Sequence, residues 1–162
     1  MTVASKSMDQ VGAVARLTGL FQTVTGFFST SLVPLFDLFI RLWIAKVFFW
    51  SGLTKIRDWE NTLFLFELEY QVPILPVPVA AFLGTAFELL CPILLAVGFA
   101  TRFAALPLLA MALVIQFVLG AANPAFDHVQ HYYWMILLVA IVLRGAGPIS
   151  LDQLIGKRLA RA

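Results

Sequence analysis

Four long apolar stretches, separated by short polar segments, constrain the fold of this chain more than any other feature. They cover residues 35–56, 76–98, 103–122 and 129–143. Each is close to the roughly 20 residues that an α-helix needs to cross a hydrocarbon core of about 30 Å. The fourth is the shortest, and its first tyrosines suit the membrane surface, where Tyr and Trp are enriched. The pattern predicts an all-α integral membrane protein with a four-helix transmembrane bundle.

The composition favours a membrane location over a soluble fold. Of the 162 residues, 61% are hydrophobic and 12% are charged, whereas a typical soluble chain has about 25% charged residues. Core helices of a soluble protein are the alternative, but four consecutive apolar segments leave too little polar surface to cover them. The net charge is +2 and the basic residues are scattered, so we expect no nucleic-acid partner. The single cysteine, Cys91, excludes a disulfide or a C-x-x-C pair within the chain.

Two flanking segments have the pattern of helices that lie in the membrane surface. In the N-terminal segment, residues 1–34, apolar side chains recur every three or four positions between 11 and 28. Polar residues interrupt this segment, so we expect no cleaved signal peptide. In the C-terminal segment, residues 149–162, Ser150 and Gln153 have the spacing of a capping box. The prediction is an interfacial segment at 1–34, a bundle at 35–148 and an interfacial helix at 149–162, with frayed ends as the alternative.

The distribution of basic residues predicts the orientation, because Lys and Arg near span ends are retained in the cytoplasm. With four spans, one side receives Lys6, Arg16, Arg102, Arg144, Lys157, Arg158 and Arg161. The other side receives Lys55 and Arg57, followed by a loop, predicted at 57–75, that is otherwise acidic. We therefore expect both termini in the cytoplasm and the acidic loop outside.

Arg41 and Glu88 are ionisable residues inside the predicted spans, and such residues are functional candidates because they cost free energy in a bilayer. Each lies on a helical stripe of small residues, which lets another helix approach, so both are expected to face the bundle interior. We predict that they pair, and that Lys55, Gln116 and His131 line a polar cavity open toward the outer face. The cavity would bind a quinone head group or relay protons. The alternative is a structural pair that only fixes helix register.

Lys46 is a third ionisable residue in the first span, about 140° around the helix from Arg41. It lies among aromatic residues that include Trp43 and Trp50. We predict that Lys46, Trp43 and Trp50 form a face for a protein partner or for a second copy of the chain. Snorkelling to the surface and stacking on tryptophan rings are the alternatives.

Asp127, His128 and His131 are residue types that bind metals, but two histidines and one aspartate are too few to specify a site. We expect histidines that titrate near neutral pH at the membrane surface, and no metal. The sequence also lacks a Gly-rich phosphate loop, a nucleophile elbow, and H-E-x-x-H or C-x-x-C-H motifs. We therefore predict no catalytic residues, and at most a subunit of an enzyme that needs a partner.

Three segments, in order, carry a resemblance to a known family. They read RLWIAKVFFWSGLTK from Arg41, ELLCPILLAVGFATR from Glu88, and HYYWMILLVAIVLRGAGPISLD from His131. Together they make the stretch from Arg41 to Asp152 resemble the DoxX family of small four-helix membrane proteins. The matching residues are Arg41, Leu42, Phe48, Gly52, Lys55, Glu88, Gly98, Thr101, Arg102, His131, Trp134, Arg144, Gly145, Gly147, Ser150 and Asp152. Ala45 and Lys46 depart from the family pattern, which often has Gly at the first position and usually an apolar residue at the second.

The resemblance implies a bacterial inner-membrane protein linked to redox chemistry, since the family takes its name from a component of a thiosulfate:quinone oxidoreductase. It suggests an accessory subunit of a quinone-linked or thiol/sulfur-related redox system, with quinone bound and a protein partner supplying electrons. The alternative is a non-enzymatic membrane anchor or assembly factor that recruits a partner through the acidic loop and the Lys46 face. A transporter is a third alternative, disfavoured because no paired inverted repeat is found.

Overall fold

The computed structural model describes residues 16–70, 72 and 75–161. All regular structure in these residues is helical, so the predicted all-α fold class is confirmed. The chain divides into two compact units, residues 1–36 and 37–162, which are described separately. The first fifteen residues of the predicted interfacial segment, with Lys6, and Pro73 of the predicted acidic loop lie outside the described residues.

The described part of the first unit is a helix with an exposed apolar surface. Residues 16–27 are α-helical, and a stretch of π-helix, η1 (Phe28–Leu32), follows. Threonine hydroxyls bond to carbonyls one turn earlier, for example Thr23 Oγ1 to Gly19 O at 2.9 Å and Thr30 Oγ1 to Gly26 O at 2.7 Å. These local bonds satisfy the hydroxyls without water, which suits a helix that contacts lipid.

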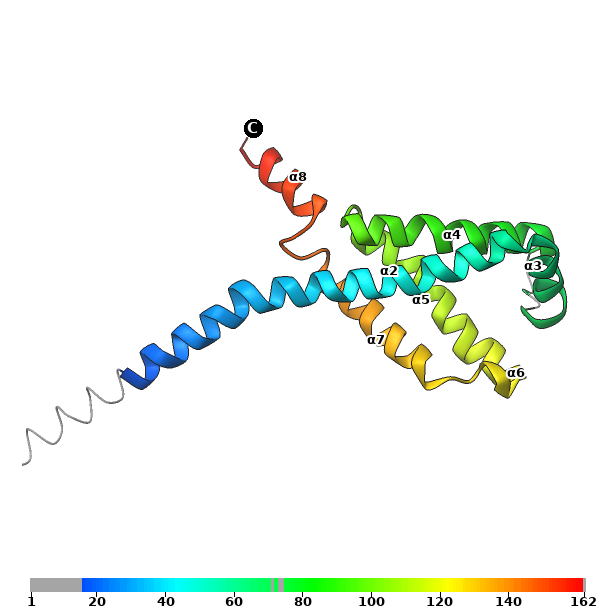
Figure 1. Cartoon of the computed structure of the whole chain (residues 1–162), viewed down its shortest axis with the longest axis horizontal. Coiled ribbons are helices and arrows are strands. Elements are labelled where there is room, and N and C mark those ends of the chain that lie inside the picture. The colour runs from blue at the N-terminus through cyan, green and yellow to red at the C-terminus, as the bar shows by residue number, and fades with distance from the viewer. Residues whose placement is uncertain (1–15, 71, 73–74, 162) are drawn as a thin grey trace, which may run out of the picture. The chain divides into compact units, whose positions relative to one another are not determined.

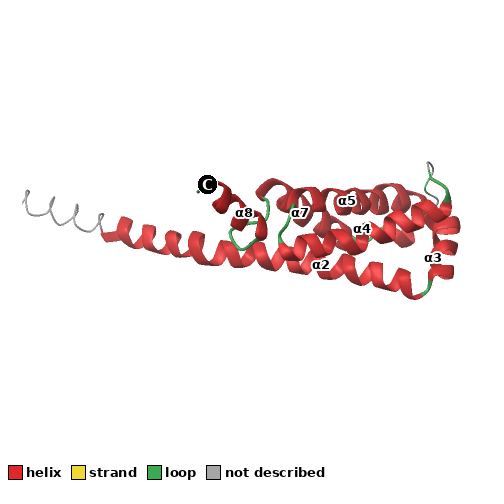
Figure 2. Ribbon diagram, turned by 90° about the horizontal axis from the view of Figure 1, so that it is seen from above, coloured by secondary structure: helices red, strands yellow, loops and turns green. Residues whose placement is uncertain are grey.

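The second unit is built from helices that run alongside one another (Figure 1 and Figure 2). The elements are α2 (Val33–Arg57, which enters this unit at Asp37), α3 (Trp59–Leu65), η2 (Phe66–Tyr70), α4 (Val77–Val97), α5 (Thr101–Leu113), η3 (Val114–Leu119), α6 (Gly120–Ala122), η4 (Pro124–Phe126), α7 (Val129–Arg144) and α8 (Leu151–Leu159). Helix α5 packs against both α4 and α7. Figure 2 shows α3 crossing the end of the bundle opposite α8.

The core of the second unit combines large aliphatic side chains with small ones that let the helices approach. Ile44, Leu95, Leu108 and Leu138, from α2, α4, α5 and α7, are fully buried together with small alanine side chains of α2 and α5. Gly52 marks a close approach of α2 and α4. A Cβ atom there would lie 2.9 Å from Leu89 Cγ and 3.1 Å from Glu88 Cβ, so only glycine fits without a shift.

Two helical segments are long and apolar enough to cross a membrane: α4 (Val77–Val97) and the continuous helix Thr101–Ala122. Helix α7 is apolar but has 16 residues. Helix α2 has 25 residues, but every stretch of 18 within it contains at least three charged residues. The helix bounds agree with the predicted apolar stretches within a few residues, and large apolar side chains such as Phe82, Leu90 and Ile136 point outward. Such an exposed apolar surface is typical of helices that contact lipid.

The segment predicted as an acidic loop is mostly helical, and that part of the prediction is wrong. Asp58 caps α3 by accepting a hydrogen bond from Asn61 N at 3.0 Å, which stabilises the first turn. Thr62 Oγ1 donates to the carbonyls of Lys55 and Asp58. Phe66 then packs on Ala80 and Ala81 of α4. These local caps and one buried aromatic ring fold the segment back onto the bundle, while Glu67 and Glu69 remain exposed.

Candidate functional site

An ion pair between α2 and α4 lies near the end of the bundle that α3 covers. Lys55 Nζ is 2.6 Å from Glu88 Oε2 and also donates to Ser51 Oγ at 3.0 Å. Glu88 is only 3% exposed. A charge this deeply buried is stable only when it is paired, so Lys55 and Glu88 form one unit.

The predicted pair between Arg41 and Glu88 is wrong. Glu88 lies against Gly52, which is one turn from Lys55 but eleven residues, or about 16 Å along the helix, from Arg41. Arg41 is 1% exposed, and its guanidinium donates to the carbonyl oxygens of Leu95 and Ile149. The helical periodicity correctly predicted that Arg41 and Glu88 are buried. Their positions along α2 and α4 explain why Glu88 pairs with Lys55 and not with Arg41.

A second polar chain joins η3, α7 and the turn between them. Gln116 Nε2 donates to Asp127 Oδ1 at 2.5 Å, and Gln116 Oε1 lies 3.0 Å from His131 Nδ1. Because a carboxylate only accepts, it fixes the amide orientation, and the amide oxygen then requires a proton on His131 Nδ1. Gln116 and His131 are both buried, and the His131 ring packs 5.1 Å from that of Trp134.

Tyr70 lies between the two polar groups. Its ring centroid is 4.9 Å from that of Phe66 and 5.9 Å from that of Phe126, the neighbour of Asp127. Burial raises the pKa of the Tyr70 hydroxyl, and the negative charge of Glu88 raises it further, so the phenol is protonated and close to that carboxylate. Tyr70 therefore lies near the Lys55–Glu88 pair and near the turn that contains Asp127. It was not predicted as a site residue because the sequence placed it in a loop.

Thr85 adds an unsatisfied hydroxyl beside the ion pair. It is one turn before Glu88 on α4, and its buried Oγ1 lacks a hydrogen-bond partner among the described residues. A buried hydroxyl without a partner is rare and calls for an explanation.

The predicted partner face on α2 is exposed. Lys46, Trp43 and Trp50 all lie on the surface of the second unit, and no hydrogen bond or ion pair involves Lys46 within the part of the chain that the structure describes. Asp127, His128 and His131 do not form a metal cluster, since no group of three or more suitable ligands is found among the described residues.

The opposite end of the bundle gathers a second set of polar residues from α2, α5, α7 and α8. Asp152 accepts from the backbone N–H groups of Ala100 and Thr101, at 2.8 and 3.1 Å, and so caps α5. Ser150 caps α8 by accepting from Gln153 N at 3.2 Å, which confirms the predicted cap. Burial opposes the charge of Asp152, but the two N–H groups, the Thr101 side chain and Arg41 outweigh it and leave the Asp152 pKa below its ordinary value.

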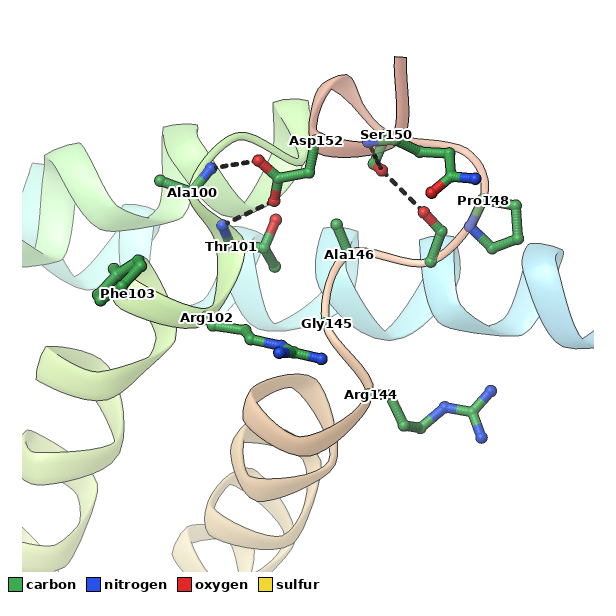
Figure 3. A pocket seen from close by; sticks show the side chains of 12 residues that line it. Ala100, Thr101, Arg102, Phe103, Arg144, Gly145, Ala146, Pro148, Ser150 and Asp152 are labelled. Atoms are coloured by element: carbon green, nitrogen blue, oxygen red, sulfur yellow. Dashed lines mark hydrogen bonds between the residues drawn. The ribbon is translucent and has the colours of Figure 1, made fainter. Parts of the chain in front are cut away.

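These residues enclose an open pocket of about 520 Å³, shown in Figure 3. Arg102 reaches from α5 to the backbone at Leu143, where it donates to the carbonyl at 3.3 Å. Arg144 instead reaches α2, where its Nε and Nη2 donate to the two carboxylate oxygens of Asp37 at 3.0 and 3.1 Å. No pattern in the sequence predicted a site here, although most of the residues that line the pocket are among those that carry the resemblance to DoxX proteins.

Comparison with known proteins decides the family. A family model described as DoxX matches residues 36–121, just over half of the chain. This chain belongs to the DoxX family. The match includes Arg41, Lys55, Glu88 and Gln116, and it ends before His131. An uncharacterized protein of Haemophilus influenzae strain Rd is 30% identical over 129 residues, covering 74% of this chain and 83% of that protein.

No solved structure matches the chain. Membership of the DoxX family, together with the apolar helices, identifies the chain as a membrane protein whose surface contacts a lipid bilayer.

Proposed function

We propose that this DoxX protein is an inner-membrane accessory subunit of a quinone-linked or thiol/sulfur-related redox system. In this proposal the ranges 35–56, 76–98, 103–122 and 129–143 span the bilayer, with interfacial segments at 1–34 and 149–162. Both termini are cytoplasmic, which fits the positive-inside rule. The arrangement of α2, α4, α5 and α7 side by side supports four spans, and the meeting of Arg102, Arg144 and α8 at one end supports the orientation.

The observation that carries the proposal is the buried Lys55–Glu88 pair with the free Thr85 hydroxyl beside it. Quinone reduction needs two electrons and two protons, and the residues of this site would serve the protons. The Lys55 ammonium would hydrogen-bond to a quinone oxygen and give it a proton, and the Glu88 carboxylate would hold Lys55 in place and pass on the replacement proton. His131 and Asp127, both held by Gln116, would supply protons from the surface, while a protein partner provides the electrons.

The test is retention of quinone during purification in mild detergent, measured by extraction and chromatography. The native chain should carry quinone, and Glu88→Gln should lose it. Glu67→Gln, an equal change at an exposed site, should retain it. Glu88→Gln leaves a partly buried Lys55 unpaired and could disturb the fold. A Lys55→Met/Glu88→Leu double variant, which buries no charge, therefore tests the loss of quinone in a protein that is expected to fold. Normal quinone retention in either site variant would disprove the quinone site.

The second candidate is a membrane anchor or assembly factor, and the exposed Lys46 face favours it. A lysine in the middle of an apolar helix, without a polar partner in the described chain, suits contact with an acidic group of another membrane helix. Lys46→Leu should then abolish recovery of a partner after cross-linking in membranes, while Glu88→Gln should leave that recovery unchanged. The reverse pattern would support the quinone proposal instead.

A further inference from the structure

The open pocket between α5, α7 and α8 has a basic group that is exposed to incoming molecules. Arg102 is exposed, and a single 3.3 Å hydrogen bond to the Leu143 carbonyl is the only one that its guanidinium makes to described residues. Gly145 provides the room for it, because a Cβ at that position would lie 3.2 Å from Arg102 Nε. A guanidinium held across a backbone in this way keeps several N–H groups available for an anion.

The carboxylates near the pocket are already occupied. Both oxygens of Asp152 accept backbone N–H groups of α5, and Figure 3 shows them turned toward Ala100 and Thr101. Asp37 is held by the two nitrogens of Arg144. The Arg144–Asp37 pair is neutral as a unit, and Arg41 lies behind Asp152. Arg102 therefore faces the pocket without an acidic partner of its own among the described residues.

The wall of the pocket is polar as well as basic. Thr101 lines it and is completely buried, with its side chain turned to the Asp152 carboxylate. The Gln153 amide lines the same wall. A volume of about 520 Å³ lies within the range of small-ligand sites and accommodates a phosphate with its glycerol.

The rim distinguishes a lipid from a free anion. Phe103, beside Arg102, is 77% exposed, and Leu143 and Ile149 also present large apolar side chains to the outside. These apolar side chains would contribute nothing to the binding of a free phosphate, whereas they would pack favourably against lipid acyl chains. Lys157 and Arg158 on exposed α8, with Arg161 just after it, place further positive charge near the same end, which attracts anionic bilayers.

We propose that this pocket binds the phosphate of an anionic phospholipid, with Arg102 as the principal contact and Phe103 against the acyl chains. The site is distinct from the Lys55–Glu88 pair and does not depend on the quinone proposal. Its occupant would fix α8 against the bundle, because the pocket is lined by residues of both.

Native mass spectrometry of the whole protein in detergent, titrated with phosphatidylglycerol or phosphatidylcholine, tests the proposal. The native chain should retain phosphatidylglycerol preferentially, and Arg102→Gln should weaken that binding about tenfold or more, as expected for loss of a charged hydrogen bond. Arg158→Gln removes the same charge from the same end but outside the pocket, so its effect should be much smaller. Equal losses in the two variants, or no preference between the lipids, would overturn the proposal.

Two further arms identify the source of the phosphate and guard against misfolding. Phe103→Ala, at an exposed position, should weaken the binding of phosphatidylglycerol but leave the binding of glycerol phosphate unchanged. Inorganic phosphate that displaces the lipid completely at millimolar concentration would show a free-anion site and overturn the lipid assignment. Arg102→Lys keeps the charge, so it should bind more phosphatidylglycerol than Arg102→Gln does if the arginine contacts the anion. If Arg102→Lys binds no better and its circular dichroism spectrum is altered, the substitutions disturb the fold, and this result would count against the assignment.

Discussion

The guanidinium of Arg41 donates a hydrogen bond to the backbone carbonyl of Ile149, 108 residues later in the chain. The same side chain also bonds to the Leu95 carbonyl at 3.3 Å. One buried arginine on α2 thus ties together the end of α4 and the segment that leads into α8. This link, and not a pairing with Glu88, explains why a charge is kept in the interior at this height.

Removing the Arg41 side chain should destabilise the protein and release α8. Arg41→Met removes the donor of the Ile149 carbonyl and one of the two donors of the Leu95 carbonyl, which keeps Gly98 N at 3.2 Å, and should lower the free energy of unfolding by about 1–3 kcal/mol. Arg41→Lys should lose less, because an ammonium still donates. Hydrogen exchange of the α8 amides measures the release, and unfolding in a denaturing detergent measures the stability. Full protection of α8 in Arg41→Met would contradict this role.

Gly52 is the position where a single added methyl group should matter most. Gly52→Ala would press on Leu89 and Glu88 and should cost about 1–3 kcal/mol through overpacking, as measured by thermal unfolding. Gly156→Ala is the matched control, since nothing lies within 4 Å of its Cβ position. There the better helix propensity of alanine should stabilise α8 or leave it unchanged. Equal melting temperatures for the two variants would contradict the close approach of α2 and α4.

The Lys55–Glu88 pair should show strong coupling in a double-mutant cycle. Each single change, Lys55→Met or Glu88→Leu, leaves a partly or fully buried charge and should cost about 3 kcal/mol. The double variant removes both charges and should regain most of that loss. Additive effects of the two changes would mean that the residues do not form one unit.

Acid should release Asp152 from the end of α5. Its folded-state pKa is below the ordinary value of 3.8, so its contribution to stability is complete above that pH and is lost as the pH falls through the folded-state pKa. Asp152→Asn should lower stability by about 1–2 kcal/mol at neutral pH and remove this acid sensitivity. Exchange rates of the Ala100 and Thr101 amides, followed as the pH falls from neutral to well below 3.8 and corrected for intrinsic exchange, report the change.

The helices and the inward direction of the polar residues were predictable because the length of each apolar stretch and the spacing of residues within it depend only on that segment of the sequence. Arg41, Glu88, Gln116 and His131 were all expected in the interior, and all four are buried. Partner choice was not predictable, because it depends on the relative heights of packed helices. The contact of Gly52 with Glu88 sets that height, and no local pattern in either helix encodes it.

The pocket near Arg102 was missed for a different reason. It is assembled from two tight turns, at Gly98 and at Gly145 and Gly147, whose positive φ angles bring segments more than forty residues apart into contact. Glycine alone adopts such conformations easily, so the repeated glycines beside Arg102 and Arg144 were the available signal. Likewise, the helical turn at Phe66 and Tyr70 depended on burial against α4, which acidic composition did not reveal.

The long separation between Arg41 and Ile149 has a consequence for biosynthesis. At about 5–20 residues per second, Arg41 leaves the site of synthesis roughly 5 to 20 s before its last partner exists. During that interval the guanidinium must be held by water or by lipid phosphate, because the Leu95 carbonyl also arrives late. Helix α2 thus enters the bundle before the Arg41 guanidinium has all of its hydrogen-bond partners. The last partner, the Ile149 carbonyl, is added when the carboxyl-terminal segment folds onto the bundle.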